Sequence, residues 1–238
     1  AGRAGLLLAD QVGVLVNERR RASAHVLVAS LDAPELDEVD AHHLSKVLRL
    51  RAGETVTVTD GDGRWRSTTY GADGLLAVTS DIRAEATREP RLTVVFALTK
   101  GDKPEVVVQK LAELGVDRVI PYRAERSVVR WDDDKAERQS DRWRRVMREA
   151  LMQSRSVRLT EVVDVQPNLE SAIAGLNVDG LVIAEPDGGE FDRSVSSVVI
   201  GPEGGFSDYE LSLISRQVAL PGGVLRAETA AIVAGALL

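Results

Sequence analysis

The carboxy-terminal part of the chain alternates short apolar runs with helical patterns, and this alternation constrains the fold more than any other feature. "LTVVFALT" at residues 92–99 is a continuous apolar run, and "KPEVVVQKLAELG" at 103–115 has the spacing of a helix that ends at a glycine. Runs and helices keep alternating to the end of the chain. Strands that are apolar on both faces and joined by helices form parallel sheets covered on both sides. We therefore predict an α/β domain with a mostly parallel sheet over residues 90–238.

A different pattern precedes residue 85. "ETVTVTD" at residues 54–60 alternates with the period of a strand, "GDG" supplies a tight turn, and "WRSTTY" at 65–70 continues as a second strand. Short strands with turns this close predict a small barrel or antiparallel sheet over residues 1–85. The charged, proline-containing segment at 84–91 marks the boundary between the two domains.

Composition excludes several classes of protein. The chain has no cysteine and only three histidines, which argues against disulfides, thiolate zinc sites, a cysteine nucleophile and a histidine metal cluster, so we expect no metal. No apolar run is long enough to span a membrane. "AGLLLADQVGVLV" at residues 4–16 is interrupted by Asp10 and lacks a basic leader. We therefore expect a cytoplasmic protein without a membrane span.

Charge is distributed unevenly along the chain. The net charge of −7 argues against a generally basic nucleic-acid surface. However, residues 91–165 carry 16 basic and 13 acidic side chains, whereas residues 166–238 carry 3 and 10. A chain polarised in this way can offer one surface to a polyanion and keep another for a different ligand.

The segment "VVIGPEGGFSDYE" at residues 198–210 joins a strand end to a helix start through a glycine loop. Ser207 and Glu210 form a capping-box pattern, and in open α/β sheets ligands bind at such strand ends. The loop lacks both the Gly-Lys-Ser/Thr ending of a P-loop and the G-x-G-x-x-G spacing, and Glu203 would repel a phosphate. The ligand expected here is neutral or cationic. S-adenosylmethionine is one such ligand, and a tight turn without any ligand is the alternative.

Two further strand ends strengthen the case for a ligand. "LPGGVLRAETAAIVAGALL" at residues 220–238 contains a glycine turn followed by a helix of small residues, which suits a tight core or a dimer contact. "IAEP" at residues 183–186 is a third strand end with an acidic residue and a proline.

Four motifs in order resemble one family. They are "ERSVVRW" at 125–131, "RWRRVMREALMQS" at 142–154, "IGPEGGFSDYE" at 200–210 and "LRAETA" at 225–230. This set resembles the RsmE family, the 16S ribosomal RNA uracil-N3 methyltransferases of the SPOUT superfamily. The resemblance begins at "AHHLSKVLRLRAGE", residues 41–54, and residues 1–24 have no counterpart in it.

The resemblance implies a two-domain RNA-modifying enzyme. An amino-terminal PUA-like β-barrel would help to bind RNA, and a carboxy-terminal SPOUT domain would contain a deep trefoil knot. The enzyme would be a homodimer that methylates N3 of a specific uridine in 16S rRNA of the small ribosomal subunit. S-adenosylmethionine would be its cofactor and would lie in the knot, against thirteen residues: Ala184, Glu185, Pro186, Ile200, Gly201, Pro202, Glu203, Gly204, Gly205, Leu220, Gly223, Leu225 and Arg226.

N3 methylation requires loss of the imide proton and stabilisation of the resulting negative charge. We predict that Arg226 stabilises the uracil anion while Glu228 and Thr229 orient it. Glu203 is predicted either to face the sulfonium or to act as the base. A structural salt bridge between Arg226 and Glu228 is the alternative.

RNA contacts are predicted on the basic middle segment and on a second basic cluster near residue 46. The candidate residues are His43, Lys46, Arg49, Arg51, Lys100, Arg126, Arg130, Arg145 and Gln153. A solvated helix held by salt bridges is the alternative for the arginines. The chain departs from the family at Arg155, which stands where a glycine usually follows the serine.

Three other functions stay open. Within the methyltransferase class, the target is another base or another RNA. Outside it, a non-catalytic RNA-binding module explains the small domain and the arginines, and a nucleotide-dependent α/β enzyme explains the sheet.

Overall fold

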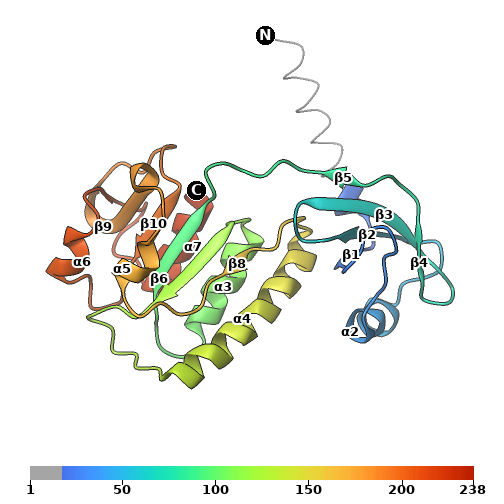
Figure 1. Ribbon diagram of the computed structural model, residues 1–238, viewed down its shortest axis with the longest axis horizontal. Helices are drawn as coiled ribbons and strands as arrows, with labels where there is room; N and C mark the ends of the chain where they lie inside the picture. The colour runs from blue at the N-terminus through green and yellow to red at the C-terminus, as the bar shows by residue number, and fades with distance from the viewer. Residues whose placement is uncertain (1–17) are drawn as a thin grey trace, which may run out of the picture. The chain divides into compact units, whose positions relative to one another are not determined.

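The computed structural model describes residues 18–238, which form two compact units (Figure 1). The first unit extends to Thr87 and also contains Leu151–Arg158. The second comprises Arg88–Ala150 and Leu159–Leu238. Most of the segment 1–24, for which the resemblance supplies no counterpart, lies outside the described residues. No helix between residues 18 and 238 has the length and apolarity needed to span a membrane.

The first unit is built on a five-stranded sheet with the path β1-β2-β3-β4, and β5 pairs with β3. Its strands are β1 (Ala24–Leu27), β2 (Thr55–Thr59), β3 (Arg64–Tyr70), β4 (Leu76–Val78) and β5 (Arg83–Ala84). The other pairs are antiparallel, but β1 and β2 are parallel, so the sheet is mixed. A parallel pair needs a long connection, and here it contains helix α2 (Glu38–His42) and a π-helical turn, η1 (His43–Val47).

Leu151–Arg158 is held in the first unit by hydrogen bonds to β1 and to the residues before it. The Ser156 carbonyl accepts from His25 Nε2 at 2.8 Å. Arg155 has a φ of 59°, the left-handed conformation that a glycine adopts easily. Its guanidinium donates to the carbonyls of Arg19 and, at 2.6 Å, Ala22. The turn therefore keeps a glycine-like backbone although the residue is arginine.

The second unit confirms the predicted parallel α/β sheet. Its six strands are all parallel and lie in the order β11-β9-β10-β6-β7-β8. The strands are β6 (Thr93–Ala97), β7 (Arg118–Tyr122), β8 (Glu161–Val162), β9 (Leu181–Gly189), β10 (Ser197–Ile200) and β11 (Gln217–Val218). The helices are α3 (Lys103–Glu113), α4 (Asp133–Ser154), α5 (Leu169–Ile173), η2 (Val178–Gly180, a 3₁₀ turn), α6 (Asp208–Ser212) and α7 (Ala227–Leu237).

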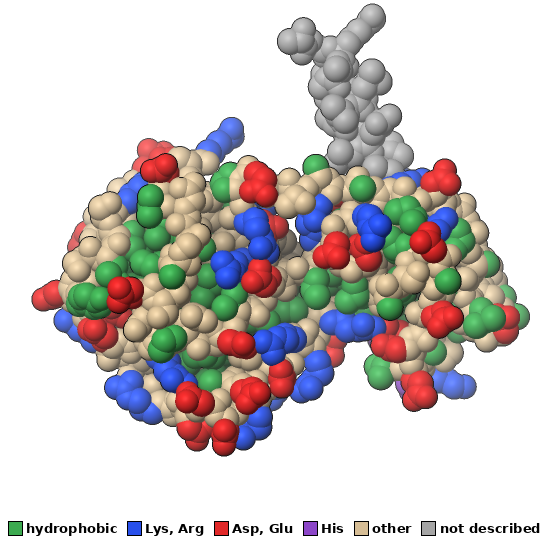
Figure 2. Space-filling model, in the orientation of Figure 1, with side chains coloured by type: hydrophobic (Ala, Val, Ile, Leu, Met, Phe, Trp, Pro, Cys, Tyr) green, Lys and Arg blue, Asp and Glu red, His purple; other side chains and the backbone are tan. Residues whose placement is uncertain are grey.

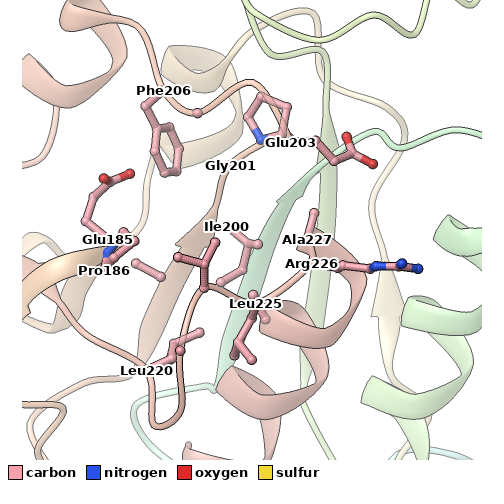
Figure 3. Close-up of a pocket in the computed structure, with 16 residues that line it drawn as sticks. Glu185, Pro186, Ile200, Gly201, Glu203, Phe206, Leu220, Leu225, Arg226 and Ala227 are labelled. Atoms are coloured by element: carbon pink, nitrogen blue, oxygen red, sulfur yellow. The ribbon is translucent and has the colours of Figure 1, made fainter.

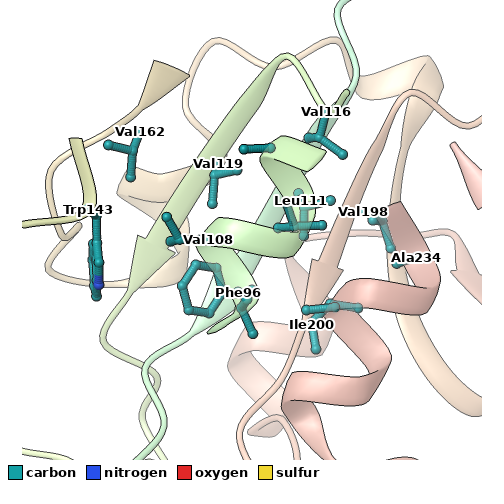
Figure 4. Packing of buried hydrophobic residues seen from close by; sticks show 14 of the residues in the cluster. Phe96, Val108, Leu111, Val116, Val119, Trp143, Val162, Val198, Ile200 and Ala234 are labelled. Carbon is teal, nitrogen blue, oxygen red and sulfur yellow. The ribbon is translucent and has the colours of Figure 1, made fainter. Parts of the chain in front are cut away.

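Both faces of this sheet are buried, because alternate residues of each strand enter different cores. On one face Val94 and Phe96 of β6 pack with residues of α3, α4 and α7 (Figure 4). On the other face Val95 and Ala97 pack with residues of α5 and with Phe206. Period-two alternation of apolar side chains to opposite faces explains why β6 reads as a continuous apolar run.

Candidate active site

A cavity of about 450 Å³ lies beside the middle of β9 and beyond the carboxyl end of β10, next to the loop after β11 and the start of α7 (Figure 3). Twelve of the thirteen residues predicted to contact the cofactor line it. The thirteenth, Gly204, does not: a Cβ at Gly204 would lie 2.9 Å from the Arg126 carbonyl oxygen. The lining residues that the sequence did not predict are Phe206, Val224, Ala227 and Ala230.

The wall formed by β9 results from an interruption in its pairing with β11. Gln217 pairs with Ile183, but the next residue, Val218, pairs with Gly189. The intervening residues of β9 leave the ladder, and Ala184, Glu185 and Pro186 line the cavity. Bulges of this kind redirect side chains next to functional sites.

The glycine loop after β10 carries an aromatic side chain over the cavity. A Cβ on Gly201 would lie 2.8 Å from Cε2 of Phe206, so only glycine allows the ring to take this position. The predicted capping box is present, because Ser207 accepts from the Glu210 backbone and Glu210 accepts from the Ser207 backbone. Glu210 is 2% exposed and its second carboxylate oxygen accepts from the Glu125 backbone at 3.2 Å. One buried carboxylate thus fixes the loop that holds Phe206.

Four charged side chains gather at one side of the cavity. Lys103 Nζ lies 3.4 Å from Glu203 Oε1 and 3.2 Å from Glu228 Oε1. Arg226 is exposed and stands at the N-cap of α7, and Figure 3 shows Glu203 and Arg226 on the same side of the cavity, opposite Glu185. The alternative for Arg226, a salt bridge to Glu228, is not what the structure shows: Glu228 pairs with Lys103, and no ion pair joins Arg226 to any residue between 18 and 238.

The sequence did not identify Lys103 as a site residue. Only its position could have identified it: Lys103 follows a buried strand and lies in the first turn of a helix, where the positive end of the helix dipole disfavours a cation. Thr229, a predicted orienting residue, is exposed in the first turn of α7 and does not line the cavity.

Two carboxylates have pKa values shifted in opposite directions: Glu185, which lines the cavity, and Glu228, which does not line it but pairs with Lys103 beside Glu203. Burial raises the pKa of Glu185, and the nearby charge of Asp187 adds to the effect. Burial also raises the pKa of Glu228. This effect is outweighed by the hydrogen bond from its own backbone N–H and by the charges of Lys103 and Arg226, so the pKa lies below the ordinary value. Glu228 is therefore held ionised. The pKa of Lys103 is raised by its bonds to Glu228 and Glu203.

Sequence and structure comparisons assign this arrangement to a family. Residues 87–238 match the RNA methyltransferase domain family, and residues 36–77 match the RNA methyltransferase PUA domain family. The chain belongs to the RNA methyltransferase family. It is 32% identical to ribosomal RNA small subunit methyltransferase E of Mycobacterium bovis, over 84% of this chain and 83% of that protein. It is 29% identical to the Bacillus subtilis protein of the same name, over 82% and 85%.

A solved structure of similar fold supports the same assignment. A Legionella pneumophila methyltransferase in complex with S-adenosylmethionine superposes with a TM-score of 0.73 at 28% identity, over 91% of this chain and 96% of that one. The fold is therefore that of the SPOUT methyltransferases with an amino-terminal PUA domain, as predicted. The trefoil knot stays a prediction.

In the PUA domain and its flanking turns, the predicted RNA contacts are exposed. His43 and Lys46 lie in η1, and Arg49 has a φ of 55° in the following turn with Arg51 close behind it. Gln153, at the end of α4, is also exposed and belongs to the same unit.

In the methyltransferase domain, the predicted basic residues differ in how far they are engaged. Lys100 and Arg145 are exposed, and neither makes an ion pair within the described part of the chain. Arg126 lies 3.8 Å from Asp208, and Arg130 donates to the Ser127 carbonyl at 2.9 Å. Figure 2 shows acidic and basic side chains interspersed on the visible face of this domain. Salt bridges thus occupy part of the predicted basic surface.

Proposed function

We propose that this protein transfers a methyl group from S-adenosylmethionine to N3 of a uridine in 16S rRNA of the small ribosomal subunit. One observation carries the proposal: twelve of the thirteen residues assigned to the cofactor from the family resemblance line one cavity of an RNA methyltransferase domain. The relatives named ribosomal RNA small subunit methyltransferase E support the RNA, and the Legionella structure supports the cofactor.

The cavity suits this cofactor in size and chemistry. Its volume of about 450 Å³ lies within the range of roughly 300–1,000 Å³ typical of ligand sites. Phe206, Leu220 and Leu225 supply apolar surface for an adenosine. Glu185 and Glu203 supply negative charge that suits a sulfonium or an ammonium and disfavours a phosphate. S-adenosylmethionine, when bound, supplies an electrophilic methyl group.

Arg226 is the cation assigned to the reacting base. Uracil N3 carries a proton, so the ring must become an anion before N3 acts as a nucleophile. An unpaired guanidinium offers several N–H donors to the developing charge on the ring carbonyls. Arg226 lines the cavity and makes no ion pair with any residue between 18 and 238, which fits this role.

We assign different roles to the two carboxylates, Glu228 and Glu203. A lowered pKa makes Glu228 a weak base, so we assign it, with Thr229, to orienting Arg226 and the base. Glu203 is the more accessible of the two carboxylates, with 45% of its side chain exposed against 18% for Glu228, and is the better placed proton acceptor.

Recognition of N3 also constrains the RNA and the assembly. N3 lies on the Watson–Crick edge, so the target uridine must be unpaired or flipped out of a helix. The exposed cations of the PUA domain are assigned to the flanking RNA backbone. A homodimer and a cytoplasmic location complete the proposal, and light scattering on the purified protein tests the dimer.

Methylation of defined RNA tests the function. The protein is incubated with labelled S-adenosylmethionine and either naked 16S rRNA or small subunits, and the modified nucleoside is identified by mass spectrometry. We expect 3-methyluridine. A different methylated nucleoside would mean another substrate, and no incorporation together with calorimetric binding of ATP or NAD would point to a nucleotide-dependent enzyme.

The role of Arg226 is tested by substitution. Arg226→Ala is expected to abolish methyl transfer, because the anion loses its counter-charge, while the Kd for S-adenosylmethionine stays within a few fold. Arg193→Ala is the matched control, since Arg193 is an exposed arginine of the same unit that does not line the cavity. Equal turnover of the two variants would remove Arg226 from the mechanism.

A further inference from the structure

Lys103 connects two parts of the cavity wall that are distant in sequence. Its ammonium lies within 3.4 Å of Glu203 in the glycine loop and within 3.2 Å of Glu228 in the first turn of α7. No other basic side chain in the described chain makes an ion pair with either carboxylate.

A lysine at position 103 does not stabilise the helix that carries it. Lys103 is in the first turn of α3, where the helix dipole favours carboxylates and disfavours cations by about 0.3–1 kcal/mol. Asp102, at the N-cap, makes no side-chain capping bond that could offset this cost. The lysine is explained by the two carboxylates across the loop.

The charge balance at the cavity shows what the ion pair does for Arg226. Glu228 Oε2 is buried and has no hydrogen-bond partner, and Arg226 is close enough to lower the pKa of Glu228. A buried carboxylate with an unsatisfied oxygen attracts any cation within reach. Besides Lys103, Arg226 is the cation whose charge acts on Glu228, so without Lys103 we expect Arg226 to neutralise it.

We propose that Lys103 is a positioning residue: by pairing with Glu203 and Glu228 it fixes the glycine loop against α7 and leaves Arg226 free for the substrate. The inference rests on the proposed function, because that function supplies the uracil that Arg226 contacts. It assigns to Lys103 no contact with either the RNA or the cofactor. A lysine that instead contacts an RNA phosphate is the competing interpretation.

The test compares four variants in methylation assays with S-adenosylmethionine and 16S rRNA. Lys103→Met removes the charge and keeps the length of the side chain. Lys110→Met is the control, because Lys110 also lies in α3 but pairs with Glu113 at 2.7 Å and with neither Glu203 nor Glu228. Misplacing a catalytic group by about 1 Å costs on the order of a hundredfold in rate, so we expect a fall of this size in kcat for Lys103→Met and none for Lys110→Met. Thermal melting of each variant verifies that it is folded.

The double variant K103M/E228Q, set beside E228Q alone, separates the two interpretations. Removing the charge of Glu228 takes away the carboxylate that would draw Arg226 from the substrate, so the double variant should be more active than K103M. E228Q alone sets the upper limit of this recovery, because Glu228 is also assigned to orienting the base. No recovery, with a raised KM for RNA in K103M, would overturn the proposal in favour of a phosphate contact. Unchanged kcat in K103M would overturn it outright.

A measurement independent of activity distinguishes failure of this inference from failure of the proposed function. The side-chain Nε–H signal of Arg226 is followed by NMR in the wild-type protein and in K103M. We expect slower hydrogen exchange and a shifted signal in K103M, because Arg226 then pairs with Glu228. An unchanged signal contradicts the inference even if the enzyme methylates RNA, whereas a shifted signal in a protein that is inactive on 16S rRNA contradicts only the proposed substrate.

Discussion

Gly201 shows how one missing side chain shapes the cavity. A methyl group there would lie 2.8–3.0 Å from three atoms of the Phe206 ring, closer than packed carbons come. Phe206 is 4% exposed and has no space to retreat into the core. We expect Gly201→Ala to destabilise the protein by about 1–3 kcal/mol, as overpacking does, and to weaken cofactor binding at least about tenfold by moving the ring. Calorimetry and thermal melting measure the two effects.

Gly189→Ala is the control for this prediction. A Cβ on Gly189 would lie 3.6 Å from its nearest neighbour, the Gln217 carbonyl oxygen, which is an ordinary contact. This variant should bind the cofactor as the wild type does. If Gly201→Ala binds equally well, Phe206 is not part of the cofactor site.

Arg155 stands where the family resemblance predicts a glycine, and the structure gives a physical reason why arginine is tolerated there. A left-handed conformation costs a non-glycine residue about 1 kcal/mol or more. The guanidinium bonds to the Arg19 and Ala22 carbonyls offset this cost, since a bond from a charged donor contributes about 1.5–3 kcal/mol. The sequence identified the substitution, but the compensating carbonyls are more than a hundred residues away.

At the scale of the element, helix α6 depends on a single buried carboxylate. Glu210 accepts hydrogen bonds from the backbone N–H groups of Ser207 and Glu125. In Glu210→Gln one acceptor oxygen becomes an N–H₂ donor, so one of these buried donors loses its partner. We expect a loss of about 1–3 kcal/mol in the free energy of unfolding, measured by urea denaturation.

Ser212→Ala provides the comparison within the same helix. Ser212 is exposed and donates only to the Tyr209 carbonyl, so its loss should change stability by less than about 0.5 kcal/mol. A cost for Glu210→Gln no larger than that for Ser212→Ala would show that the capping box contributes nothing beyond ordinary helix ends.

The elements themselves were predictable where their signal is local. β6 and β10 are apolar runs and α6 begins at a capping box, so residues a few positions apart determined each prediction. β11, two residues long, has no periodicity to detect. The break in β9–β11 pairing and the Lys103–Glu203 contact, which spans 100 residues, depend on tertiary packing. The parallel β1–β2 pair was missed for the same reason.

In the whole molecule, the chain leaves the first unit after Thr87 and returns to it at Leu151–Arg158. His25 holds the returning segment by a hydrogen bond to Ser156. His25 of β1 is 4% exposed; its Nδ1 lies 2.8 Å from Thr57 Oγ1 in β2, and its Nε2 donates to the Ser156 carbonyl, 131 residues away. A carbonyl can only accept, so Nε2 carries the proton, whereas the Thr57 hydroxyl, which also donates to the Ala24 carbonyl at 3.4 Å, can either donate to Nδ1 or accept from it. Burial of the ring is what favours the neutral imidazole.

Acid should therefore weaken the first unit through His25. Burial lowers the pKa of His25 from 6.5 to about 4; the Ser156 carbonyl opposes this shift, and the charges of Arg19 and Arg155 add to it. Between pH 6.5 and 4 the unfolded chain binds the proton and the folded chain does not. Stability is thus complete above pH 6.5 and falls as the pH drops toward 4, by on the order of 3 kcal/mol in total. Urea unfolding from pH 7.5 down to 5 should show this slope in the wild type and in His42→Gln, whose histidine is exposed. His25→Gln should be less stable at pH 7.5 yet nearly independent of pH over that range; a slope equal to that of the wild type would show that another group is titrating.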